Sequence, residues 1–286
     1  MNIALFALRN LTRSIPRTIL QVVGIGLITA IMLVWGCLNT GLEDLLQKSA
    51  TDLDVGEIQI HGPGYVASPD LYKTLPYTES WLKQLSNAGF TAAPRVYGFG
   101  LAGAGNLSAG VQVRGVDLRL EPSVTEVNEA VGHGQWLAET APSDVVIGRV
   151  LARRLHLKVG DEIVLLAQAA DGSAANAIFH VRGILSPVSD DIDSRAVYMA
   201  MPAFQQYFRL QAGVHEIALR RLDKAQPLAV AKNNLTEVLK KLRVSTELHT
   251  WRQLKPVLAK MLDILSVSSK FIFAFIYPVS YTHLTL

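Results

Sequence analysis

The stretch TILQVVGIGLITAIMLVWGCLNTGL, residues 18–42, contains no charged side chain and decides the architecture of the chain. Its 25 residues would form a helix roughly 37 Å long at ~1.5 Å of rise per residue, enough to cross the ~30 Å hydrocarbon core of a membrane. The apolar part of a cleaved signal peptide is shorter, typically ~7–15 residues. A lipoprotein signal ending at Cys37 is a second alternative, but the bulky Trp35 stands where such a signal needs a small residue. We therefore predict a membrane-spanning helix over residues 18–42.

The charges on the two sides of this span predict its orientation. Arg9, Arg13 and Arg17 precede the span, whereas the residues that follow it are mainly acidic: Glu43, Asp44, Asp52, Asp54 and Glu57, with Lys48 as the lone cation. Positively charged short flanks stay in the cytoplasm. We therefore expect the N-terminus inside the cell and the following domain outside it. Residues 1–17 are predicted to form a cytoplasmic amphipathic elbow helix, with the three arginines opposite its apolar face.

Residues 43–249 have the composition of a globular domain, which we predict to be an α+β extracytoplasmic domain between transmembrane helices. The domain contains no cysteine, since Cys37 is the only one in the chain, so an internal disulfide is excluded. Its length is ample for a packed core. The hydrophobic patterns and turn residues predict helices over 41–54, 78–88, 149–155 and 227–242, and strands over 55–60, 95–102, 111–116, 145–147, 163–167, 179–184 and 215–220.

Residues 250–277 are predicted to form a helix that leads back into the membrane. Thr250 and Gln253 have the spacing of a capping box, and apolar residues, Leu258 among them, then recur at helical intervals from Leu254 to Leu265, which predicts a capped helix from Trp251 to Leu265. We expect this capped helix, which includes Trp251, to act as a lever into the second span. Only 16 residues follow Lys270. We therefore interpret the second span as truncated and residues 278–286 as a probable foreign or truncated tail.

Motifs for catalysis or cofactor binding are weak or incomplete. The segment GFGLAG, with Gly98, Gly100 and Gly103, matches the dinucleotide fingerprint, but more glycine and then a strand follow it where a helix should hold the phosphates. We interpret it as a flexible β-hairpin. No GxSxG elbow surrounds Ser108, because Asn106 replaces the first glycine. Without a phosphate-binding loop of the form GxxxxGK[ST], the chain is predicted not to bind ATP itself.

Metal and nucleic-acid sites are also disfavoured. The histidines are scattered without a helical three- or four-residue spacing, and no cysteine is available to complete a zinc site: His61, His133, His156, His180, His215, His249 and His283. The acidic cluster Asp190, Asp191 and Asp193 lacks the ligand ladder of a calcium loop and is interpreted as a solvated loop. Three basic pairs are interpreted as solvated surface: Arg153 with Arg154, Arg220 with Arg221, and Lys240 with Lys241. We expect no cofactor, no metal and no nucleic-acid partner.

Four passages carry a resemblance to a known family. They are ALRNLTRSIPRTILQVVGIGL, GEIQIHGPGY, VIGRVLARRLHLKVGDEIVLL with FHVRGIL, and TWRQLKPVLAKMLDI. In this order the chain resembles the FtsX-like ABC transporter permeases of the lipoprotein-releasing (LolC/LolE) type, which have a MacB-like periplasmic domain. The resemblance covers nearly all of residues 1–277. Because such permeases are expected to continue through four spans, the chain is expected to be an N-terminal fragment of one.

The resemblance implies a non-catalytic permease subunit in the bacterial inner membrane, multi-pass in its full-length form, with a large periplasmic domain. The implied partners are an ABC ATPase subunit, a second permease subunit in a homodimer or heterodimer, membrane lipid, and a periplasmic carrier or adaptor. GEIQIHGPGY favours lipoprotein release from the inner membrane. The alternatives are MacB-type export of a drug or peptide and a membrane-anchored regulator of cell-wall hydrolases. An anchored hydrolase is disfavoured, because no nucleophile constellation was found.

Overall fold

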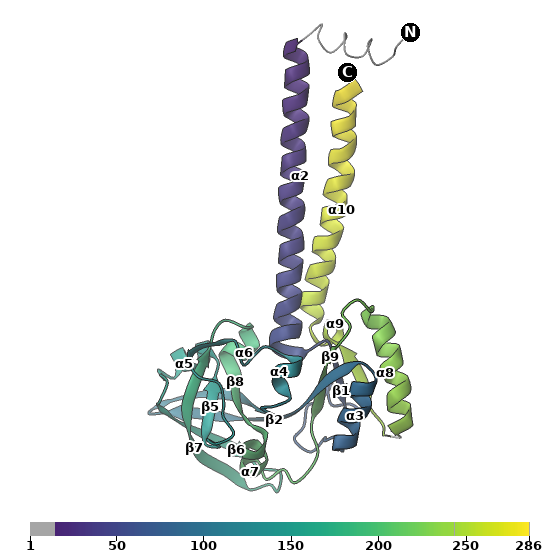
Figure 1. The fold of residues 1–286 in the computed structure, drawn as a ribbon. Coiled ribbons are helices and arrows are strands. Elements are labelled where there is room, and N and C mark those ends of the chain that lie inside the picture. Colours follow the sequence, from purple (N-terminus) through teal and green to yellow (C-terminus); the bar gives the residue numbers. More distant parts are fainter. Residues whose placement is uncertain (1–14, 243, 286) are drawn as a thin grey trace. The chain divides into compact units, whose positions relative to one another are not determined.

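The computed structural model describes residues 15–242 and 244–285 (Figure 1), so Arg9, Arg13 and nearly all of the predicted elbow helix lie outside the described residues. The chain divides into two units. One is Lys48–Lys255, and the other consists of the flanking segments Met1–Gln47 and Pro256–Leu286.

Two long helices dominate the flanking unit. Helix α2, Ile15–Ala50, has 36 residues and begins with Pro16 in its first turn, where a missing amide costs no hydrogen bond. Within the described residues, one helix, Thr18–Val55, is long and apolar enough to cross a membrane, and none of its most apolar window is buried. Helix α10, Pro256–Thr285, continues past residue 277, so the predicted start of a tail at residue 278 matches no element boundary.

Helix α2 passes into the domain through a π-helical turn, η1, Thr51–Val55. The helical extension expected for residues 41–54 is therefore present as the end of α2 and this turn. The first strand, β1, begins only at Ile58 and ends at His61, later than the expected start at Val55, because residues 51–55 are still coiled.

The domain contains short helices and ten strands. The helices, in chain order, are α3 Glu79–Asn87, α4 Glu121–Val124, α5 Arg149–Arg154, α6 Asp190–Arg195, α7 Met201–Tyr207, α8 Leu228–Leu242 and α9 Trp251–Leu254. After β1, the strands are β2 Phe90–Ala104, β3 Leu107–Val116, β4 Val131–Gly134, β5 Asp144–Ile147, β6 Glu162–Gln168, β7 Ala174–Leu185, β8 Ala196–Ala200, β9 Glu216–Arg221 and β10 Glu247–Thr250.

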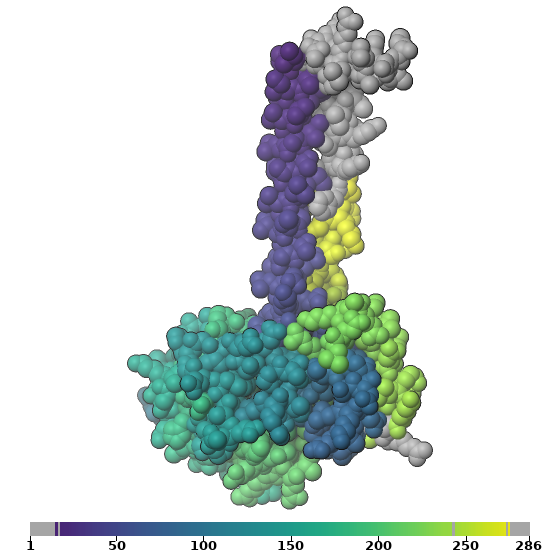
Figure 2. Space-filling model, viewed as in Figure 1, coloured from purple at the N-terminus to yellow at the C-terminus, as the bar shows by residue number. Residues whose placement is uncertain are grey.

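Six of the strands pair in a closed ring. Strand β2 pairs with β3, β3 with β8, β8 with β5, β5 with β7, β7 with β6, and β6 again with β2. A closed ring has no free edge strand, and its interior can be filled by side chains. The ring therefore forms a small barrel on one side of the domain. Figure 2 shows residues of this barrel and of the rest of the domain as one continuous blue-to-green body.

Phe204 of α7 and Phe208, which caps the end of that helix, pack against the barrel, and glycines make room for them. A Cβ atom on Gly98 would lie 2.3 Å from the Phe208 ring, and one on Gly115 would lie 2.6 Å from Phe204 Cβ. Phe204 and Phe208 are fully buried and stack on each other with ring centroids 4.3 Å apart. Gly98 therefore belongs to the packing of a long β-strand. The GFGLAG segment lies in the β2–β3 hairpin, as expected, although the turn itself is only at Gly105 and Asn106.

The other half of the domain is an open antiparallel sheet. The first half of β2 pairs with β9, β9 with β1, and β1 with β10. Helices α3 and α8 supply apolar residues to the same core, among them Trp81, Leu85 and Leu235. The strand that follows the entering helix, β1, and the strand that precedes the exit from the domain, β10, are thus direct neighbours.

Two local predictions were wrong. The helix expected to be continuous from Trp251 to Leu265 is broken at Lys255, whose backbone angles (φ −120°, ψ 63°) are not helical, and α10 starts afresh at Pro256. The expected solvated loop of Asp190, Asp191 and Asp193 is helix α6, whose first turn Ser189 caps by accepting the Ile192 amide. Acidic residues in the first turn stabilise a helix through its dipole, which explains why a cluster of aspartates is helical here.

Candidate coupling site at the entrance of the domain

The entering chain makes a sharp turn against strand β9 before β1 begins. The Gly56 amide donates to the Thr51 carbonyl at 3.0 Å, which closes the π-helical turn. Gly56 has a φ of +72°, and a Cβ atom there would lie 3.2 Å from the Leu219 carbonyl oxygen. Both facts require glycine at this position. The turn places Asp54 next to Arg114 of β3 and Asp52 next to Arg220 of β9.

Asp54 is a buried carboxylate with two cationic partners. Its side chain is 4% exposed, and its Oδ1 accepts from Arg114 Nη1 at 3.1 Å. The Lys255 ammonium lies 2.6 Å from Asp54 Oδ2 as an ion pair rather than a well-aligned hydrogen bond. Burial acts to raise the pKa of Asp54, but Arg114 and Lys255 outweigh it and hold the pKa below its ordinary value. Asp54 is therefore ionised and links the entry of the chain to its exit.

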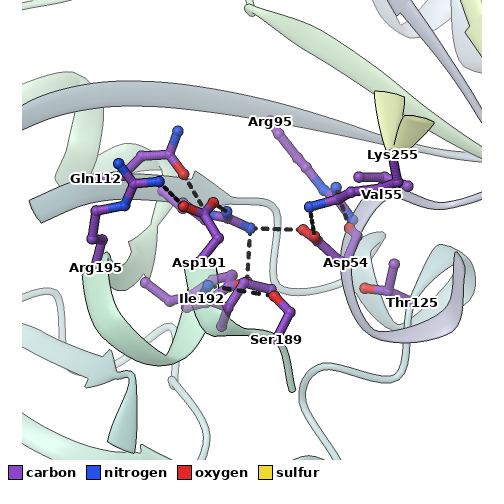
Figure 3. Close-up of polar contacts among 12 residues, drawn as sticks. Asp54, Val55, Arg95, Gln112, Thr125, Ser189, Asp191, Ile192, Arg195 and Lys255 are labelled. Atoms are coloured by element: carbon purple, nitrogen blue, oxygen red, sulfur yellow. Dashed lines mark hydrogen bonds and ion pairs between the residues drawn. The ribbon is translucent and has the colours of Figure 1, made fainter. Parts of the chain in front are cut away.

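Figure 3 shows this convergence: Asp54 and Val55 of the entering turn lie between Lys255 on one side and Asp191 with Arg195 on the other. Lys255 is the last residue of the unit, directly before α10. Its ion pair with Asp54 thus joins the two points at which the chain crosses the boundary of the domain.

Arg95 of β2 holds the same turn from the barrel side. Its guanidinium forms a two-pronged contact with Glu121 of α4, with Nε–Oε2 at 3.0 Å and Nη2–Oε1 at 2.6 Å. Nη1 donates to the Asp54 carbonyl at 2.8 Å and to Glu216 Oε1 at 2.9 Å. Burial acts to lower the pKa of Arg95, but Glu121 and Glu216 together raise it well above its ordinary value. The fork geometry fixes the backbone of the turn and its side chain in one position.

Arg114 of β3 is the second buried arginine of the site. Its charge lies over the rings of Tyr97 and Tyr198, 5.7 Å and 5.6 Å from the centroids. Its Nη1 donates to the Tyr198 hydroxyl at 3.2 Å, and its Nη2 reaches Asp191 at 3.5 Å. Both contacts to aromatic faces stabilise a cation that burial removes from water. Asp191 comes from α6, so this arginine connects the entering turn to the barrel and to α6.

Strand β9 contributes a second, partly exposed layer of ion pairs. Arg221 donates to Glu57 through Nε at 2.7 Å and through Nη2 at 3.1 Å. Arg220 contacts Glu126 at 3.2 Å and Asp52 at 3.6 Å. The interpretation of this basic pair as solvated surface was therefore wrong, because both side chains are less than one fifth exposed.

The charges of the inner layer balance. The acids Asp54, Glu121 and Glu216 face the bases Arg95, Arg114 and Lys255, so three negative groups meet three positive ones. All except Lys255 have side chains no more than 8% exposed. Removal of one partner would leave an uncompensated buried charge, which typically costs about 3–5 kcal/mol. The arrangement specifies one geometry for the entering turn.

The predicted cap residues lie beside this network. The Thr250 amide donates to Gln253 Oε1 at 3.0 Å, which is the reciprocal half of a capping box. Trp251 is 4% exposed, and its amide donates to the Glu57 carbonyl at 3.1 Å. Leu258 is in the first turn of α10, beyond the break at Lys255. Arg17 lies in α2, and its side chain is not described.

Sequence reasoning missed the buried arginines Arg95 and Arg114. A signal was present, because a charged residue stands alone inside each of two apolar strand patterns, PRVYGFG and VQVRGV. Such a residue is almost never fully buried unless it is paired. The partners could not be deduced, because Glu121 and Glu216 come from other elements, one far along the chain.

Comparison with known proteins identifies the family. The model of the MacB-like periplasmic core domain matches residues 18–238. The periplasmic region of MacB from Actinobacillus actinomycetemcomitans is similar in structure, with a TM-score of 0.50 at 16% identity over 71% of this chain and 92% of that chain. The extracellular domain of the noncanonic ABC-type transporter YknZ from Gram-positive bacteria gives a TM-score of 0.47 at 11% identity, over 68% of this chain and 99% of that one. The comparison with curated proteins finds no match.

The chain therefore belongs to the family defined by the MacB-like periplasmic core domain, that of FtsX- and MacB-like ABC transporter permeases. The resemblance inferred from the four sequence passages is confirmed at the level of FtsX- and MacB-like permeases, and so is the expected α+β extracytoplasmic fold behind an apolar helix. Within the residues that the structure describes, no group of three or more histidine, cysteine or acidic side chains is arranged to hold a metal ion.

Proposed function

We propose that this chain is part of a permease subunit in the bacterial inner membrane, and that a partner ATPase moves its extracytoplasmic domain. The observation that carries the proposal is the coupling site, in which Asp54 at the entry and Lys255 at the exit form a 2.6 Å ion pair within a buried network. The network joins the first and the last residues of the domain to each other, as we expect of a domain that is moved from the membrane.

The charges support the orientation. Arg9, Arg13 and Arg17 precede the span and keep the N-terminus in the cytoplasm, so residues 48–255 lie on the periplasmic side. The full-length subunit would cross the membrane several times and pair with a second permease subunit. Energy would come from ATP bound by the partner, because the sequence contains no phosphate-binding loop.

The mechanism follows from the contacts. A displacement of the entering helix would act first on the turn Thr51–Val55. In this turn, Arg95 donates to the Asp54 carbonyl and Arg114 donates to the Asp54 carboxylate. These arginines belong to β2 and β3, which form one wall of the closed barrel. A bidentate, buried contact transmits displacement better than an exposed pair, which water screens. The helix and the barrel would thus move together, and the capped segment Thr250–Gln253 would follow through Trp251.

For the cargo we favour an outer-membrane lipoprotein, lifted from the periplasmic leaflet and passed to a carrier, because GEIQIHGPGY resembles the lipoprotein-releasing branch. Within this passage, Ile58–His61 form β1 beside the coupling site. Export of a drug or peptide through an adaptor, and regulation of a cell-wall hydrolase, are the other functions that this architecture would serve.

The proposal is tested by reconstitution of the complete permease in proteoliposomes, with and without its partner ATPase. The permease alone should neither bind nor hydrolyse ATP, and with the ATPase it should release a radiolabelled lipoprotein to a soluble carrier. ATP binding by the permease alone would contradict the division of labour. ATP-driven release of a periplasmic drug with no effect on the lipoprotein would favour the export function.

A further inference from the structure

A second group of buried titratable side chains lies next to the coupling site, on the strands that carry the entry and the exit. His61 of β1 pairs in register with Glu247 of β10 on one side and with Glu216 of β9 on the other. Residues directly opposite each other in a sheet point to the same face. His249 and Gln59 occupy the adjacent register position on that face.

The rings form a stack. His61 lies flat on Tyr65 with centroids 5.4 Å apart, and Tyr65 lies flat on His215 at 5.5 Å. The edge of His249 meets His61 at 5.6 Å, with an angle of 64° between the rings. His61 is 2% exposed and His215 is completely buried.

The hydrogen bonds fix the protons of two rings. The Gln59 amide nitrogen donates to the Val55 carbonyl at 2.8 Å and to Glu216 Oε1 at 3.1 Å, so its oxygen is the atom that accepts from His61 Nε2 at 2.9 Å. His61 is then neutral, with a bare Nδ1 that has no hydrogen-bond partner. His215 Nδ1 accepts from the Tyr97 amide at 2.8 Å, and its Nε2 donates to the Leu71 carbonyl at 2.9 Å.

These bonds connect the histidines to the coupling site. Gln59 holds the Val55 carbonyl in the entering turn and shares Glu216 Oε1 with Arg95. A proton on His61 Nδ1 would create a buried cation, which only Glu216, Glu247 and a backbone hydrogen bond with His215 would favour. The nearest anionic groups are Glu216, which Arg95 and Gln59 already occupy, and Glu247, which accepts the Gly64 amide at 3.1 Å. A charged His61 ring would compete with Arg95 and Gln59 for Glu216, which lies opposite it in the sheet.

We propose that the buried histidines His61 and His215, stacked on the two sides of Tyr65, are a proton-operated switch that loosens the attachment of β1 and β10 to the coupling site when the periplasm becomes mildly acidic. In this range, about pH 5–8, histidine is the side chain whose charge ordinarily changes. The switch acts on the residues that join the entry to the exit, so its effect on transport rests on the function proposed above.

The direction of the pH response follows from the shifts. Burial is the largest cause that lowers the pKa of His61, and the nearby His249 adds to it, whereas Glu216, a backbone hydrogen bond with His215 and Glu247 act in the opposite direction. Burial also lowers the pKa of His215 below 6.5, against the Leu71 carbonyl, Glu216 and Asp70. The folded chain therefore binds these protons more weakly than the unfolded chain does. The neutral histidines therefore leave the fold at full stability above pH 6.5. The folded state loses stability as the pH falls from 6.5 through the lowered pKa values of His61 and His215.

The test measures hydrogen–deuterium exchange by mass spectrometry on the full chain in lipid nanodiscs, at several values between about pH 5 and 8. After correction for the intrinsic exchange rate, protection of β1 and β10 amides should fall with acidification, while protection of β6 and β7 should not. The loss should be about tenfold for each unit by which a histidine pKa is lowered. The substitution His61→Gln keeps a donor at the position of Nε2 and should abolish most of the loss, whereas His133→Gln, at an exposed ring on β4, should leave it intact.

Exchange of the histidine ring Cε1 protons, measured in the same unmodified chain, reports the titration of each ring and requires no variant. Equal protection of β1 and β6 across this range, or an unchanged acid response in a folded His61→Gln protein, would overturn the switch. If His61→Gln does not fold, a His61 ring pKa at its ordinary value of 6.5 in the unmodified chain would also overturn the switch. These outcomes do not involve ATP, so the switch can fail while the proposed function stands.

Discussion

At the scale of single residues, Asp54 determines how the entering helix is attached. It combines a buried carboxylate with two cations from distant parts of the chain, Arg114 and Lys255. The substitution Asp54→Asn keeps the shape but leaves Arg114 without its buried anion. We expect a loss of about 3–5 kcal/mol of unfolding free energy, measured in detergent by tryptophan fluorescence during thermal unfolding.

The matched control for Asp54 is Glu237→Gln, which removes one partner of an exposed ion pair with Lys240. Solvent screens an exposed ion pair and leaves it little effect on stability, so this variant should unfold like the wild type. The pKa of Asp54 is lowered in the folded state, so its contribution is present above the ordinary carboxylate pKa and lost as the pH falls through the lowered value. Equal destabilisation by both substitutions would show that burial of the Asp54 pair has no special effect.

Gly98 tests the interpretation of GFGLAG as packing rather than as a nucleotide site. A Cβ atom there would lie 2.3 Å from the Phe208 ring, so Gly98→Ala should destabilise the domain by roughly 1–3 kcal/mol through overpacking. Gly110 of β3 is the control, because nothing lies within 4 Å of its added Cβ. Thermal unfolding of the two variants compares them directly, and equal melting temperatures would contradict the packing role.

At the scale of elements, the break in the helix at Lys255 determines at which positions of α10 a proline disrupts the helix. Leu258 is in the first turn of α10, where amides have no intrahelical acceptor, so a proline there would cost little. Leu265 lies inside the helix, and Leu265→Pro should cost about 3 kcal/mol or more. We expect Leu265→Pro to uncouple ATP hydrolysis from cargo release and Leu258→Pro to retain most of the coupling. Equal release per ATP in both variants would argue against α10 as a lever.

The elements also show what sequence patterns can and cannot predict. Periodicity predicted α3, α8 and the unit of β5, α5 and β6 closely, because each buries one regular face. The pattern predicted the start of β1 three residues too early. The sequence of Thr51–Val55 does not distinguish a π-helical turn from a helix followed by a strand. The closed ring depends on pairs such as Leu101 with Leu166, distant in the chain, which a local pattern cannot indicate.

At the scale of the whole molecule, the orientation underlies every functional statement. The arginines at positions 9, 13 and 17 predict that residues 48–255 are outside the cytoplasm. A periplasm-active reporter fused after Gly213 should therefore be active, and a cytoplasm-active reporter at the same position should be silent. The reverse pattern would contradict the assignment of the domain to the periplasm and with it the proposed transport role.

The central claim is that the buried network couples the membrane helix to the domain, and Lys255→Met tests it most directly. Lys255 is 29% exposed in its side chain, and the substitution keeps an unbranched stem while Asp54 retains Arg114, so the protein should fold. The measurement is cargo released per ATP hydrolysed by the reconstituted transporter, with Glu237→Gln as the reference. We predict normal ATP hydrolysis with a several-fold lower release per ATP in Lys255→Met. An unchanged ratio in a correctly folded Lys255→Met protein would contradict the account.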